Sequence, residues 1–122
     1  MIHGLISQLP SPYYEAVEKI WSELDQHFAI KSVWQNPIPH FSWQIAENHD
    51  INAIVPILES FSKGHEPFTI ETQGLSHFDG EEMVLFIKIV PEKQIIDLHK
   101  KLWTLLLAHS EKVSMIYNPQ TW

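Results

Sequence analysis

The 122-residue chain contains no cysteine, no arginine and only four glycines. The lack of cysteine excludes disulfides and thiolate metal sites, and it fits a reducing compartment. The lack of arginine excludes the bidentate fork with which a guanidinium group holds a phosphate. The four glycines form no glycine-rich phosphate loop. A bound phosphate would therefore need histidine, hydroxyl, lysine or backbone N–H groups.

Positive charge and long apolar runs are also scarce. The chain contains fifteen acidic residues and eight lysines, which gives a net charge of −7. This charge argues against binding to a long nucleic acid duplex. No apolar run reaches the roughly 20 residues of a membrane span, and the first residues lack the pattern of a signal peptide. We therefore expect a cytoplasmic protein that binds no membrane.

The eight histidines show neither a pair at i,i+4 nor the His-Glu-x-x-His pattern, which are the spacings of helical zinc sites. We therefore expect no metal site and no cofactor. Any chemistry would then be carried out by the protein's own side chains.

The apolar fraction of 44% and the length predict one domain, residues 1–122, with a real core. Ser11 is expected to cap the first helix, Asp50 or Asn52 to cap the second, and Gly64 to end the second. Asp79-Gly80 is expected to form the turn of a hairpin between the last two strands. Residues 83–90 are expected to form a strand that is buried on nearly both faces. Alternation, helical spacing and turn residues predict strands at 2–9, 40–47, 68–75 and 83–90, and helices at about 12–27, 52–63 and 92–109. This order is typical of an α+β fold.

Residues 39–47 form the most informative stretch. Phe41, Trp43 and Ile45 are expected on one face of a strand, and His40 and Ser42 on the other. Gln44 would share the second face and be exposed. An imidazole beside a hydroxyl can move a proton while a phosphate oxygen is held. The alternative is an ordinary strand histidine that bonds a backbone carbonyl, beside a solvated serine.

A weak internal repeat appears when the chain is shifted by 82 residues. Within residues 13–40 the shift aligns identical residues, among them Lys19/Lys101, Trp21/Trp103, His27/His109, Ser32/Ser114, Asn36/Asn118 and Pro37/Pro119. In this alignment His40 corresponds to Trp122. We therefore expect a second copy of the His40 strand at or just beyond Trp122. An unpaired sheet edge there would favour a homodimer.

Together these features resemble the 2H phosphoesterases, the group of bacterial 2′-5′ RNA ligases and 2′,3′-cyclic nucleotide phosphodiesterases. The family carries two His-x-Thr/Ser motifs, and Pro39-His40-Phe41-Ser42-Trp43 looks like the first. Residues 117–122 look like the lead-in to the second, Trp-x-Pro-His-x-Thr, which is absent from this chain. The resemblance implies two pseudo-symmetric lobes of antiparallel sheet with helices outside and a cleft between them, the second lobe incomplete because the C-terminal part is lacking.

The resemblance also implies chemistry. His40 would be one member of a general acid/base pair, and Ser42 would bind the phosphate of a 2′,3′-cyclic phosphate or a 2′-5′ phosphodiester, without a metal. The partner would be a small nucleotide or an RNA terminus that carries a cyclic phosphate. Two rivals stay open: a non-catalytic module that binds nucleotides or RNA ends, and an α+β domain whose His-x-Ser is accidental.

Overall fold

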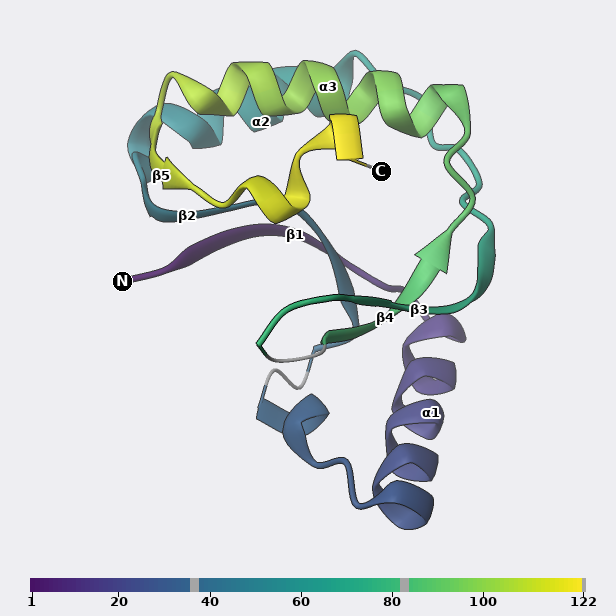
Figure 1. Ribbon diagram of the computed structural model, residues 1–122. Helices are drawn as coiled ribbons and strands as arrows, with labels where there is room; N and C mark the ends of the chain where they lie inside the picture. Colours follow the sequence, from purple (N-terminus) through teal and green to yellow (C-terminus); the bar gives the residue numbers. More distant parts are fainter. Residues whose placement is uncertain (36–37, 82–83, 122) are drawn as a thin grey trace.

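The computed structural model describes residues 1–35, 38–81 and 84–121 (Figure 1). Asn36, Pro37, Met83 and Trp122, on which some of the expectations above rest, lie outside these ranges. The elements, in chain order, are β1 (His3–Gln8), α1 (Tyr13–Phe28), the 3₁₀ turn η1 (Ser32–Gln35), β2 (His40–His49), α2 (Ile51–Lys63), β3 (Thr72–Phe78), β4 (Val84–Ile89), α3 (Lys93–Leu107), β5 (Ser110–Val113), η2 (Met115–Tyr117) and η3 (Pro119–Thr121). The expected α+β class is confirmed.

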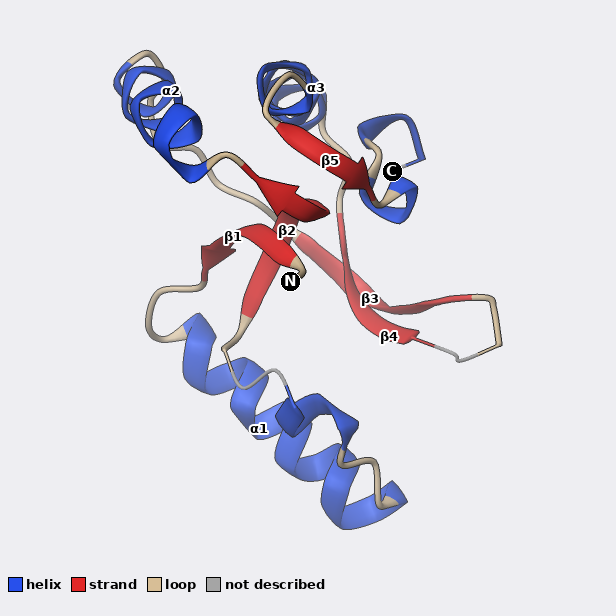
Figure 2. Cartoon of the chain, turned by 90° about the vertical axis from the view of Figure 1, so that its left-hand side faces the viewer, coloured by secondary structure: helices blue, strands red, loops and turns tan. Residues whose placement is uncertain are grey.

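The main sheet contains three antiparallel strands in the order β1-β2-β5. The strand that carries His40 is therefore the central one. Helices α2 and α3 lie side by side along one face of this sheet (Figures 1 and 2). The short strand β5 was not expected from the sequence, because Ser110-Glu111-Lys112-Val113 has too few residues to show an alternating pattern.

The core lies between β2 and the two helices. It consists of Trp43 from β2, Ile54 from α2, and Ile95, Leu102 and Leu106 from α3. The three α3 residues follow helical spacing, so they form one stripe that faces the sheet. Fully burying each such side chain contributes roughly 1.5–3 kcal/mol. This stripe therefore holds α3 against the strand that carries His40.

Strand β2 contains a bulge. Leu5 of β1 lies opposite Gln44, whereas the next residue, Ile6, lies opposite Ser42, so Trp43 is an extra residue in the pairing. A bulge of this kind places two neighbouring side chains on the same side of the strand. Accordingly Trp43 and Gln44 are both buried. The simple alternation expected for residues 40–47 stops at this point.

Strands β3 and β4 form a separate two-stranded sheet. It begins at Thr72 rather than at residue 68, and the turn at Asp79–Gly80 is where it was expected. The expectation of a strand buried on nearly both faces is wrong, because Val84 and Leu85 are 51% and 39% exposed. No further strand pairs with this hairpin among the described residues, which leaves much of its apolar surface open.

Helix α1 has no buried residue, and in both views it projects away from α2 and α3 (Figures 1 and 2). The expectation that Ser11 caps this helix is wrong. The N-cap is Pro12, and no side chain caps the helix. Ser11 instead donates a hydrogen bond from Oγ to the Glu15 carboxylate at 2.6 Å. Both ends of α2 follow the sequence, with Asp50 as the N-cap and Gly64 as the C-cap.

Candidate functional site

His40 is the first residue of β2, and its ring is oriented by a backbone carbonyl two residues earlier in the chain. Its Nδ1 donates a hydrogen bond to the carbonyl oxygen of Ile38, 2.5 Å away. Pro39, between them, is buried and accepts a hydrogen bond from the N–H of Leu9 at 3.0 Å. With the proton on Nδ1, the lone pair of the neutral ring lies on Nε2. Nε2 is therefore the atom that can accept a proton from a ligand.

Ser42 lies two residues further along the same face, before the bulge. His40 and Ser42 are both half-buried, so a small ligand can reach them. Across the strand pair, His40 lies opposite Gln8 and Ser42 lies opposite Ile6. Residues directly opposite in an antiparallel pair share a face. The structure thus brings His40, Ser42 and the exposed Gln8 together on the sheet.

Gln8 was missed by sequence reasoning. Its carboxamide offers one hydrogen-bond acceptor and two donors beside the imidazole. The information that places Gln8 beside His40 is the register of β1 against β2, which depends on the bulge at Trp43. Alternation within one strand does not contain that information.

Trp43 anchors the opposite face of β2. Its indole Nε1 donates a hydrogen bond to Ser7 Oγ of β1 at 2.7 Å. Its ring meets Phe41 edge to face, with the ring centroids 4.9 Å apart. The hydrogen bond to Ser7 ties β2 to β1 beneath the candidate site. Phe41 and Trp43 both pack in or against the core, so their expected apolar role holds.

The expectation that Gln44 is exposed is wrong, since its exposed fraction is 0%. The bulge turns it inward, where its Oε1 accepts a hydrogen bond from His49 Nε2 at 3.1 Å and lies 2.9 Å from Ser110 Oγ. Ser110 Oγ also lies 2.6 Å from the carbonyl oxygen of Leu106. Gln44 therefore joins β2 to the start of β5 and is removed from the candidate site.

His49 and His3 meet at the far end of β2. The N–H of His49 donates a hydrogen bond to His3 Nδ1 at 3.2 Å, and the two rings stack. Burial lowers the pKa of His49, and the neighbouring His3 lowers it further. Among the described residues, no three histidine or carboxylate side chains are grouped so as to hold a metal ion. This pair is therefore part of the fold.

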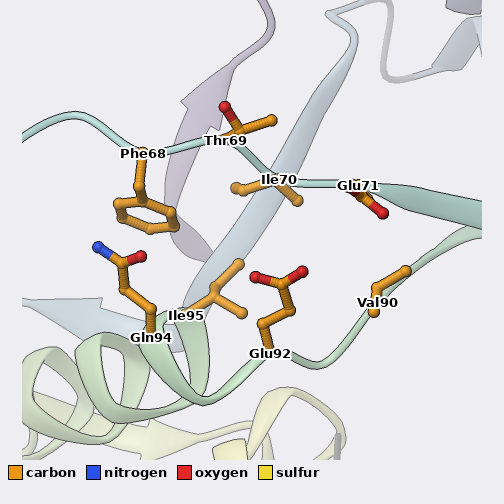
Figure 3. A pocket seen from close by; sticks show the side chains of 8 residues that line it. All are labelled: Phe68, Thr69, Ile70, Glu71, Val90, Glu92, Gln94 and Ile95. Atoms are coloured by element: carbon orange, nitrogen blue, oxygen red, sulfur yellow. The ribbon is translucent and has the colours of Figure 1, made fainter.

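Two hollows lie away from His40. One is formed by residues 68–71 and the start of α3, where Phe68 and Gln94 face one another across it (Figure 3). The other is lined by residues between the end of α2 and α3, including His65, Asp97 and Lys101. Neither is lined by His40 or Ser42. The candidate site thus lies outside both hollows, on the open face of β2 that points away from the core.

The arrangement on this face can transfer one proton and hold an anion. His40 supplies the proton-transfer atom, and Ser42 and Gln8 supply hydrogen-bond donors. In the part of the chain that the structure describes, the hydrogen bonds and ion pairs link no second titratable side chain to His40. No helix in that part is both long and apolar enough to cross a membrane.

Comparison with known proteins identifies the family. The family model described as "2'-5' RNA ligase superfamily" matches residues 9–120, which includes the whole of β2. Searches of curated proteins and of solved structures found no match. The matched range covers nearly all of the chain. This chain, with His40-Phe41-Ser42-Trp43 on its central strand, therefore belongs to the 2′-5′ RNA ligase superfamily of 2H phosphoesterases.

Proposed function

We propose that this protein is a metal-independent phosphoesterase that acts on a 2′,3′-cyclic phosphate or a 2′-5′ phosphodiester. Family membership supports the general class. The observation that carries the proposal is the orientation of His40, whose Nδ1 is engaged by the Ile38 carbonyl. This bond leaves Nε2 for proton transfer on the face that also carries Ser42. A small nucleotide or an RNA terminus suits a chain with a net charge of −7 better than a duplex.

The proposed step is hydrolysis of the cyclic ester. Water attacks phosphorus, the bond from phosphorus to one ribose oxygen breaks, and that oxygen takes a proton. One general base removes the proton from water and one general acid protonates the leaving oxygen. His40 Nε2 fills one of these roles, and Ser42 Oγ donates a hydrogen bond to a non-bridging phosphate oxygen.

The second proton-transfer group is proposed to belong to a second His-x-Thr/Ser motif. The internal repeat supports this idea, since the counterpart of His40 falls at Trp122. We propose accordingly that the two sheets belong to two related lobes of one domain, which face a cleft where the phosphate binds. The absence of cysteine favours a cytoplasmic location for this domain.

The direct test is phosphorus NMR of a 2′,3′-cyclic nucleotide incubated in EDTA with the longest natural form of the chain. The expected result is a new phosphomonoester signal for the wild type, and at least a hundredfold slower formation with His40→Gln. His77→Gln is the matched control, because His77 lies on the exposed β3–β4 hairpin and pairs with Asp79. Equal rates for His40→Gln and the wild type would refute the proposal.

The alternative is a non-catalytic module that binds nucleotides or RNA ends on the same face. It is favoured by one observation: the hydrogen bonds and ion pairs of the described residues link no second titratable side chain to His40. This module would bind the cyclic nucleotide, lose affinity on Ser42→Ala, and release no product in EDTA or in magnesium. Turnover by the wild type would exclude it.

A further inference from the structure

His99 is the polar exception in the apolar stripe of α3. It lies one helical turn after Ile95 and one turn before Leu102, and its exposed fraction is 0%. At that position helical spacing calls for an apolar side chain. Placing an imidazole there is costly unless its polar atoms are hydrogen bonded. A histidine at this position is therefore explained by the groups that it contacts.

The contact is with the bulge of β2. His99 Nε2 donates a hydrogen bond to the carbonyl oxygen of Trp43 at 2.6 Å. The His99 ring also meets the Trp43 indole edge to face, with the centroids 5.5 Å apart. Trp43 is the residue that has no counterpart on β1. Helix α3 thus supplies a donor at the point where the ladder between the strands is interrupted.

The bulge decides which side chains share the face of His40. On its N-terminal side Ser42 lies opposite Ile6, and on its C-terminal side Gln44 lies opposite Leu5. Sliding the bulge by one residue would turn the intervening side chain to the other face. Because Ser42 directly precedes the bulge, its direction depends on the bulge staying at Trp43.

We propose that His99 is a positioning residue, which through the Trp43 carbonyl holds the bulge in place and so keeps Ser42 on the same face as His40. This proposal rests on the proposed function only for the roles of Ser42 and His40 in binding and proton transfer. The placement itself stands on the hydrogen bond, the burial and the strand register. His99 acts through β2 and does not touch the ligand.

The test compares His99→Gln with His99→Met. The two side chains have similar length, but only glutamine keeps an N–H donor that can reach the carbonyl. The measurement is amide hydrogen exchange and backbone chemical shifts of Ser42, Trp43 and Gln44 at a temperature where both variants are folded. Ile95→Val, one turn away in the same stripe, is the control for loss of packing alone.

We expect His99→Met to exchange these amides at least tenfold faster and to move the resonances of Ser42 and His40. His99→Gln should stay within about threefold of the wild type, as should Ile95→Val. Equal behaviour of the glutamine and methionine variants would overturn the proposal, and so would unchanged β2 resonances in His99→Met. If the wild type shows turnover, His99→Met should lower kcat more than His99→Gln does.

This design separates the two proposals. The exchange and shift measurements need no turnover, so they judge His99 even if the wild type releases no product. Conversely, loss of product formation on His40→Gln judges the proposed function whatever His99 does.

Discussion

At the scale of residues, one side-chain type plays different parts according to its partners. His40 donates a hydrogen bond to the backbone carbonyl of Ile38 from the open face of the sheet. His99 is enclosed and donates to Trp43, and His49 is enclosed and donates to Gln44. Burial disfavours the charged imidazole, so the pKa of His99 and that of His49 are lowered, although the bond to Trp43 partly offsets the effect at His99.

These two lowered pKa values predict how stability depends on pH. In the unfolded chain both rings take up a proton near pH 6.5, whereas in the folded chain they do so only at lower pH. The unfolded state therefore binds more protons as the pH falls below about 6.5, and the free energy of unfolding decreases. Above that range both states are neutral and the contribution is constant.

Urea unfolding at pH 5 to 8 measures this dependence. The midpoint should be level between pH 7 and 8 and fall towards pH 5. His99→Gln removes one of the two titrating groups, so its midpoint should fall less steeply. If the midpoint of the variant fell as steeply as that of the wild type, the His99 ring would not be a source of the pH dependence.

Only part of the candidate site follows from the sequence. The placement of His40 and Ser42 on one face follows from strand alternation before the bulge. The burial of Gln44, the proximity of Gln8 and the role of His99 all depend on the bulge at Trp43. A bulge is set by contacts with β1 and α3, which no local pattern in residues 40–47 encodes.

At the scale of elements, α1 and α3 are similarly amphipathic in sequence but differ in packing. Helix α3 buries Ile95, His99, Leu102, Trp103 and Leu106, whereas α1 buries no residue. Most helical stability in proteins comes from tertiary packing rather than propensity. Helical periodicity correctly predicted both helices, but it did not show which of them has a partner.

The end of α1 offers a test of this local stability. Ala29 is the C-cap and is held in the left-handed region at φ 54°, where a side chain costs roughly 1 kcal/mol. Ala29→Gly should relieve that cost and slow amide exchange in the last turn of α1 by about fivefold, since about 1 kcal/mol corresponds to that factor.

Ala108→Gly is the matched control. Ala108 is the C-cap of α3 at φ −64°, where glycine brings no relief and adds flexibility. It should leave α3 exchange unchanged or make it faster. Slower exchange in both variants would contradict the explanation by backbone strain.

At the scale of the whole molecule, the order of elements up to α3 follows from the sequence, and the assembly does not. Turn residues and periodicity locate the strands, helices and hairpin within a few residues. They do not show that β2 is central, that β5 returns to pair with it, or that β3–β4 forms a sheet of its own. Those features follow from contacts between distant segments, which one sequence does not display.

The packed half of the molecule predicts where truncation is costly. Leu106 has an exposed fraction of 0%, whereas its neighbour Leu105 is 42% exposed. Leu106→Ala should lower the free energy of unfolding by about 2–5 kcal/mol, and Leu105→Ala by less than about 1 kcal/mol. Urea titrations of the two variants measure this difference. Similar losses of unfolding free energy in the two variants would contradict the assignment of Leu106 to the core.

The central claim is that the open face of β2 is the functional site, and NMR mapping with a 2′,3′-cyclic nucleotide tests it most directly. Titration in EDTA should move the resonances of His40, Ser42 and Gln8, and Ser42→Ala should weaken binding. The resonances of His65 and Lys101, at the hollow beside α3, should stay in place. Shifts centred on His65 and Lys101, with His40 unaffected, would contradict the claim.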